Sequence, residues 1–182
     1  NEMNAVEEYV CNLLCPPRGQ GQTLHDPGTD YYADDQARTW RRLGWEYVPG
    51  KELPRSPDQV LVEPHLREAL IRLNPAIAQR PERADEVIYR LRAILLSVGS
   101  AGLVGANEAL AAWLRGEHSM PFGPNHEHVT IHLVDFRDPR RNRYVVSNQV
   151  VYQGGADCRF DLVLWVNGLP LVMGECKTPT RP

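Results

Sequence analysis

The chain has 182 residues, of which 42% are hydrophobic and 24% are charged, and its net charge at pH 7 is −3. This length supports a buried core without disulfides, and the composition fits one globular domain with a small helical appendage. Every apolar run is shorter than the roughly 18–20 residues of a membrane helix, so we expect no membrane partner. Because the net charge is slightly negative, the electrostatic field of the whole protein does not attract nucleic acid. Any DNA contact must therefore rest on a local basic patch.

The chain contains four cysteines, Cys11, Cys15, Cys158 and Cys176. Four cysteines in this length form no disulfide framework, and the Cys-x₃-Cys spacing of the first pair is not a zinc signature. We therefore expect free thiols in a reducing cytoplasm. The sequence starts with neither Met nor a signal-peptide pattern, so we expect it to begin inside a longer reading frame or after a removed tag.

Helical patterns dominate the first two thirds of the chain. Residues 2–15 predict a short helix with Val6, Val10, Leu13 and Leu14 on one side, and a Pro- and Gly-rich loop follows over 16–29. Capping residues, glycines and the Asn74-Pro75 pair divide the next part into further helices, predicted over 30–43, 64–73, 81–97 and 104–115. The last two are separated by Gly99, Gly102 and Gly105, and a short extended piece is predicted over 45–48.

From His128 the apolar period changes to the alternation of strands, which we predict over 128–136, 143–152, 160–166 and 169–177. Helices dominate the early part of the chain and an antiparallel run of strands dominates the late part. This order predicts an α/β (α+β) fold, with helices packed on a mixed central sheet. We expect a helix and loop of unclear role over 1–29 and the main domain over 30–182.

The last two strands form a predicted hairpin around Asn167-Gly168, and they carry three charges in an apolar setting: Asp161, Glu175 and Lys177. Burying an unpaired carboxylate costs several kcal/mol, so something must compensate these charges. One compensation is a purely structural ion-pair cluster. The other is a divalent cation held by the two carboxylates, with Lys177 near a water molecule on the ion.

The pairing register decides whether these side chains can meet. A simple two-residue loop pairs residue 161 with 174, and Asp161 then faces away from Glu175. A third loop residue, or a bulge in one strand, pairs 161 with 175 and brings the three groups together. Pro170 cannot donate to a ladder, so irregular pairing is expected after the turn. We predict this shift, with the extra residue at the turn.

Phosphodiester hydrolysis needs a bound metal ion and an oriented water molecule. The carboxylates of Asp161 and Glu175 can hold Mg²⁺, or Mn²⁺ in its place, and Lys177 can orient the attacking water. The pattern Asp…Glu-x-Lys resembles the PD-(D/E)xK nuclease superfamily. The segments around it resemble the N-terminal nuclease domain of type I restriction enzyme R subunits, over about residues 30–180. These segments are Leu43–Glu46, Arg72–Pro75, Leu133–Phe136, Asn142, Val145–Gln149, Phe160–Leu171 and Glu175–Lys177.

The resemblance implies a restriction-endonuclease-like core in which Asp161, Glu175 and Lys177 are the catalytic triplet and Asp161 and Glu175 bind the metal. It also implies a longer subunit whose helicase-like motor domains bind ATP, and which works on duplex DNA with methylation and specificity subunits. This stretch has no Gly-x₄-Gly-Lys-Ser/Thr loop of its own, so ATP binding is expected only in the full-length subunit.

The sequence departs from the family pattern at three places. The family often carries a Glu beside the metal in its first core helix, and the matching region here offers Asp34 and Asp35 as accessory acids. Phe160 stands where the superfamily motif has Pro. The Gln-x₃-Tyr motif expected after Glu-x-Lys is absent, because the sequence ends at Pro182.

Other polar residues have a structural and a functional interpretation. Gln149 is a structural amide or touches the site, and Asp135 pairs with a basic neighbour or takes part in catalysis. The run Arg137, Arg140, Arg141 and Arg143 is a solvated turn or a patch that contacts DNA phosphates. His118, His126, His128 and His132 match no firm zinc spacing. The alternatives to the endonuclease are a non-catalytic assembly or DNA-docking module and a stand-alone nuclease for modified DNA.

Overall fold

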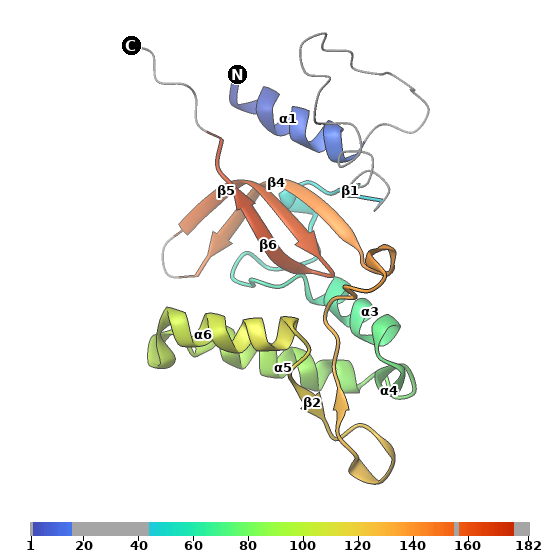
Figure 1. Ribbon diagram of the computed structural model, residues 1–182. Coiled ribbons are helices and arrows are strands. Elements are labelled where there is room, and N and C mark those ends of the chain that lie inside the picture. Colours follow the sequence, from blue (N-terminus) through green and yellow to red (C-terminus); the bar gives the residue numbers. More distant parts are fainter. Residues whose placement is uncertain (1, 16–43, 155–156, 177–182) are drawn as a thin grey trace. The chain divides into compact units, whose positions relative to one another are not determined.

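The two longest strands, β4 (Tyr144–Gln153) and β5 (Asp157–Val166), pair antiparallel at the centre of a four-stranded sheet. The structure is a computed structural model that describes residues 2–15, 44–154 and 157–176. They divide into two units, one of Asn1–Leu61 with Arg143–Pro182 and one of Val62–Asn142. The mixture of helices and strands confirms the predicted α/β class (Figure 1).

The sheet of the first unit has the order β1-β4-β5-β6. The short strand β1 (Glu46–Tyr47) runs parallel to β4, and β6 (Leu169–Gly174) runs antiparallel to β5. These elements confirm the strands predicted over 143–152, 160–166 and 169–177 and the extended piece at 45–48. The 3₁₀ helix η1 (Gly50–Glu52) follows β1.

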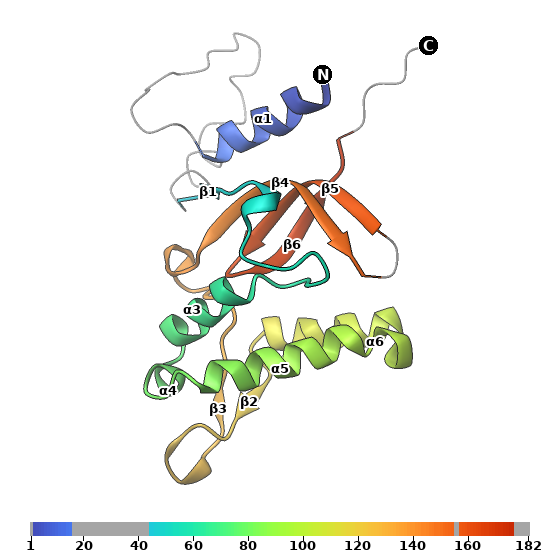
Figure 2. The ribbon, with the colours of Figure 1, turned by 180° about the vertical axis from the view of Figure 1, so that it is seen from behind.

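Helix α1 (Glu2–Leu14) lies over one face of this sheet (Figures 1 and 2). Its buried residue Cys11 shares a core with Val146 of β4 and Leu162 of β5. The predicted helix is confirmed, and Val10 and Leu14 of its predicted apolar side pack on this core. Val6, assigned to the same side, is 52% exposed, whereas Glu7 is 1% exposed, because Glu7 and Cys11, one turn apart, share the side that meets the sheet.

The Asn167-Gly168 turn closes the β5–β6 hairpin with positive φ at both residues, 52° and 80°, as a type I′ turn requires. Asn167 is fully buried, and its side-chain oxygen accepts a hydrogen bond from the Arg143 backbone N–H at 2.8 Å. Its own N–H donates to the Arg143 carbonyl. The turn therefore fixes the hairpin to the start of β4.

The second unit contains four helices: α3 (Glu63–Leu73), α4 (Pro75–Ala78), α5 (Arg83–Leu96) and α6 (Val98–Leu114). The helix predicted over 64–73 ends at Asn74-Pro75 as expected. The last two predicted helices exist, but their boundary falls at Ser97, and Gly102 (φ 76°) makes a kink within α6. By length and composition, none of the described helices alone could cross a membrane; only α5 and α6 together, bent by 115°, reach that limit.

The strand predicted over 128–136 is mostly wrong. Only β3 (Val129–Thr130) pairs, with β2 (Ser119–Met120), in a separate two-stranded sheet, and the 3₁₀ helices η2 (Pro124–His126) and η3 (Pro139–Arg141) lie nearby in sequence. Side-chain amides satisfy the backbone instead. Asn74 bonds both the N–H and the C=O of His132, and Asn142 does the same for Asp135. A strand partner is therefore not needed there.

We predict that Asn167→Ala destabilises the protein by about 2–3 kcal/mol, because it removes a buried hydrogen bond and forces a left-handed alanine. Urea unfolding of the wild type and the variant measures this loss. Asn167→Gly, which tolerates the positive φ, should lose only the hydrogen-bond part. Equal losses for Ala and Gly would contradict the backbone explanation.

Candidate functional site

One extra residue in β6 sets the register of the hairpin. Next to the turn, Val166 pairs with Leu169 and Trp165 with Pro170, but Leu164 pairs with Val172 and Leu162 with Gly174. Leu171 is therefore the unpaired residue of a β-bulge. The predicted shift of register is confirmed, although the turn itself keeps two residues and the insertion lies just after it. Continued by one residue, this register sets Glu175 opposite Asp161.

Asp161 lies on β5 beyond the last pair of the β5–β6 ladder. It is 7% exposed, and its carboxylate accepts a hydrogen bond from the Cys176 backbone N–H at 2.7 Å. Its side chain thus reaches the continuation of β6, where Glu175 precedes Cys176. Glu175 itself is exposed.

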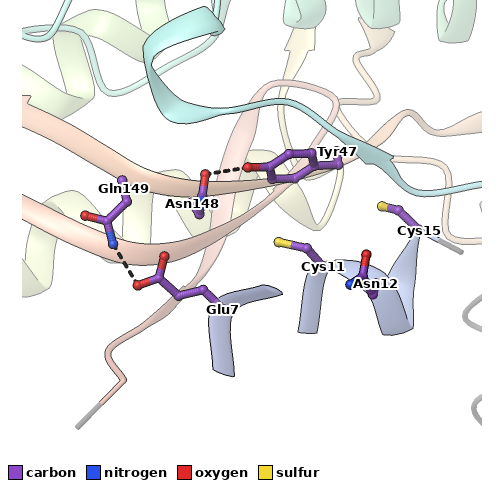
Figure 3. Close-up of a pocket in the computed structure, with 7 residues that line it drawn as sticks. All are labelled: Glu7, Cys11, Asn12, Cys15, Tyr47, Asn148 and Gln149. Atoms are coloured by element: carbon purple, nitrogen blue, oxygen red, sulfur yellow. Dashed lines mark hydrogen bonds between the residues drawn. The ribbon is translucent and has the colours of Figure 1, made fainter. Parts of the chain in front are cut away.

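A second buried carboxylate comes from α1. Glu7 is 1% exposed, and its Oε1 accepts a hydrogen bond from the Gln149 side-chain amide at 2.7 Å (Figure 3). Beside this pair, the Tyr47 hydroxyl donates to Asn148 Oδ1 at 2.8 Å. These side chains and Cys11, Asn12 and Cys15 line a pocket of about 460 Å³ between α1 and the sheet edge.

Cys176 connects the two carboxylates. Burial raises the pKa of its thiol, and the negative charges of Asp161 and Glu7 raise it further. Cys176 also packs on the core cluster that contains Cys11, which is one helical turn from Glu7. Glu7 and Asp161, 154 residues apart in sequence, therefore both influence Cys176, which follows the end of β6.

Sequence reasoning singled out Gln149, as a structural amide or a site contact, but assigned no role to Glu7. The accessory acid was sought at Asp34 and Asp35, which lie outside the described residues, as does Lys177. The signal for Glu7 was its i, i+4 spacing from Cys11 within a helix, but a lone acid among apolar residues indicates an exposed position more often than a buried one. Gln149 lies next to the hairpin as expected, and its contact with Glu7 was not foreseen.

Within the described ranges 2–15, 44–154 and 157–176, no three His, Cys, Asp or Glu side chains lie close enough together to hold a metal ion. The four cysteines are free thiols, as predicted. His118 stacks on Trp113, and His128 shares a hydrogen bond with Ser119.

Comparison with known proteins places the chain in a family. Residues 36–182 match the family described as type I restriction enzyme R protein N terminus. The chain belongs to this family. Over 152 residues, 76% of the chain, it is 36% identical to the type I restriction enzyme HindI endonuclease subunit of Haemophilus influenzae. Over 163 residues, 82% of the chain, it is 23% identical to a proposed type I restriction enzyme MjaIXP endonuclease subunit of Methanocaldococcus jannaschii.

The chain covers 14% and 15% of the lengths of these two relatives. No solved structure matches it. The family match begins at residue 36, so α1, which carries Glu7, lies before the matched part of this R-protein domain.

The arginine run of the R-protein domain is largely neutralised by acids. Arg141 pairs with Asp135 at 2.9 Å, Arg140 with Asp138 at 3.0 Å, and Arg143 with Glu46 at 2.9 Å. Asp135 therefore has the basic partner that was predicted for it. Hydrogen bonds from the Asp138 and Arg137 N–H groups, and the charge of Arg141, hold the Asp135 pKa below its usual value.

We predict that Cys15 in the pocket reacts slowly with iodoacetamide. Burial, and then the charges of Cys11 and Glu46, raise its pKa to about 11. At pH 8 its thiolate fraction is therefore on the order of 100-fold below that of an ordinary cysteine, and the rate should rise with pH up to about 11. Peptide mapping after timed alkylation measures this. The urea-unfolded chain is the control, and equal Cys15 rates in both states would contradict the prediction.

Proposed function

We propose that this chain is the Mg²⁺-dependent DNA-cleaving domain of a type I restriction enzyme R subunit. The observation that carries the proposal is the register of the hairpin, which sets Glu175 opposite the buried Asp161. Glu7 of α1 is a second buried carboxylate of the same unit. Among the described residues each of the buried pair accepts a hydrogen bond from a neutral N–H, and no arginine or lysine forms an ion pair with it.

This donor set fits a hard divalent cation. Carboxylate oxygens are the ligands that Mg²⁺ prefers, and a cation would offset the cost of burying the negative charge of Asp161. A purely structural role would need a basic partner for these acids instead. We propose that Asp161 and Glu175 hold Mg²⁺, and that Mn²⁺ can replace it.

The residues of the site divide the work of hydrolysis. The bound ion would supply a Lewis acid that polarises the scissile phosphate and makes water more acidic. Lys177, two residues after Glu175, would orient the attacking water and offset the negative charge that develops on the phosphate. Asp34 and Asp35 remain accessory acids of the same proposal.

The proposed substrate is duplex DNA, cut without reading its sequence. In the proposed full-length subunit, helicase-like motor domains would bind ATP and translocate the DNA, and methylation and specificity subunits would be the partners. This part of the proposal rests on the family match and on the names of the relatives. Arg137, Arg140, Arg141 and Arg143 would add contacts to DNA phosphates, although surface acids already pair with three of them.

We expect Asp161→Asn or Lys177→Ala in the full R subunit to lower plasmid cleavage by the assembled enzyme at least about 100-fold, because the transition state loses electrostatic stabilisation. ATP hydrolysis and translocation should continue. Asp157→Asn is a matched control, because Asp157 is an exposed acid on the same strand. Cleavage by Asp161→Asn at the wild-type rate would refute the proposed site.

We also expect Mn²⁺ to stabilise the domain. At a hundred times its dissociation constant, a ligand that binds only the folded state adds about 2.7 kcal/mol, which raises the melting temperature by roughly 5–10 °C. Asp161→Asn should remove most of this shift. A non-catalytic assembly module would show no shift in either protein, and thermal melting in a Mn²⁺ series separates the two functions.

A further inference from the structure

The second unit contains a pocket of its own, with a volume of about 530 Å³. It is bordered by α4, by the turn that leads into α5 and by the residues around β3. Pockets of roughly 300–1,000 Å³ have the size that holds a small ligand. Among the described residues no Asp or Glu lines it, whereas its polar lining includes Gln79, Arg80, Arg83, Thr130 and His132. The pocket is therefore basic, although the whole chain has a net charge of −3.

Arg83 is fixed in this pocket by its own contacts. Its Nη1 donates to the Ala76 carbonyl oxygen at 2.8 Å and to the Phe122 carbonyl oxygen at 2.7 Å, and its guanidinium carbon lies 4.9 Å from the centre of the Phe122 ring. In the described part of the chain, these contacts leave Nε and Nη2 without a hydrogen-bond partner. Because the guanidinium fork is already oriented, it loses little entropy when its remaining N–H groups bind an anion.

Arg80 adds a second positive charge that has no acidic partner. It lies three residues before Arg83 and is exposed. Within residues 2–15, 44–154 and 157–176, neither arginine forms an ion pair. Glu82 and Asp85, the acids next to them in sequence, do not line the pocket, and Asp85 pairs with Arg67 at 3.0 Å. The positive charge of the pocket is thus left for a ligand.

The lining near β3 is also held in place and is partly apolar. The buried Asn74 side chain bonds the His132 N–H at 2.8 Å and the His132 carbonyl oxygen at 2.9 Å, which fixes the backbone beside the pocket. The His132 imidazole and the Thr130 hydroxyl can donate hydrogen bonds to phosphate oxygens. Phe122 and Val129 supply apolar surface. The lining therefore offers donors for a phosphate and apolar surface for the sugar and base of a nucleotide.

We propose that this pocket binds the phosphate group of a nucleotide, which Arg80 and Arg83 contact. Arginine binds phosphate through charge-assisted hydrogen bonds, which are often paired. A DNA contact of this chain needs a local basic patch, and three of the four arginines in the run over 137–143 already pair with acids. A DNA strand is the expected source of the phosphate, and this choice of source rests on the proposed function. A free nucleotide has the same phosphate chemistry.

The test measures two probes on the 182-residue chain in EDTA, which prevents metal-dependent cleavage. Fluorescence anisotropy follows a short fluorescein-labelled oligothymidylate, and calorimetry follows thymidine monophosphate. Arg80→Ala should raise the dissociation constant of a bound probe about tenfold, because a charge-assisted hydrogen bond to phosphate is lost. For the oligothymidylate, the slope of log affinity against log salt concentration should also become shallower by about 0.7, because one phosphate contact is lost.

Two further variants separate this pocket from a general effect of charge. Arg90→Ala is the matched control, because Arg90 is an exposed arginine of α5 that does not line the pocket. It removes the same charge and should leave both the affinity and the salt slope unchanged. Arg83→Lys keeps the positive charge but removes the planar fork, so it should weaken binding of the phosphate. Each variant is first shown by thermal melting to fold.

Each outcome decides a different point. Loss of oligothymidylate binding in Arg80→Ala, without binding of thymidine monophosphate to the wild type, makes a DNA strand the source. Binding of thymidine monophosphate with the same loss in Arg80→Ala shows that a free nucleotide suffices. If Arg80→Ala and Arg90→Ala weaken binding equally, or if the wild type binds neither probe, the pocket is not a phosphate site. Asp161→Asn should bind both probes like the wild type, so this proposal and the proposed cleavage site can fail separately.

Discussion

Side chains along a β-strand alternate between two faces, and the site of this domain depends on two local breaks in that alternation. The Leu171 bulge in β6 brings Glu175 into register with Asp161. The kink at Gln149 in β4 turns an amide toward α1. Without the first, the hairpin would separate its acids on opposite faces. Without the second, Glu7 would lose its hydrogen bond to the sheet. Most of the strand backbone is regular, and the polar side chains of the proposed site lie beside its two irregular positions.

The apolar sheet also determines which partners the acids of the first unit need. A sheet whose inner strands are apolar gives a carboxylate little solvation, so the burial of Glu7 and Asp161 is costly without hydrogen-bond donors or a cation nearby. Among the described residues, the Gln149 amide donates to Glu7 and the Cys176 backbone N–H donates to Asp161. By contrast, the acids of the second unit and of the sheet edge, such as Asp135 and Glu46, pair directly with arginines. The two groups of acids therefore differ in their partners, which are N–H groups in the first case and arginines in the second.

Much of this arrangement could be predicted from the sequence. Asn-Gly between apolar runs located the hairpin, and Pro170 indicated irregular pairing beside the turn. The position of the extra residue could not be predicted, because a three-residue loop and a bulge give the same register. The strand predicted over 128–136 was mostly wrong because Asn74 and Asn142, distant in sequence or hidden in a loop, replace a strand partner. Glu7 was missed because, in an amphipathic helix, a charged residue is assigned to the exposed face.

The contribution of α1 has a consequence for biosynthesis. Glu7 emerges from the ribosome more than 150 residues before Asp161 and Glu175, with the whole second unit made in between. Contacts of such high sequence separation form late and slowly. At about 5–20 residues per second, the helix waits on the order of 10 s for its strands. A nascent chain would therefore carry no assembled proposed site until the β5–β6 hairpin has been made.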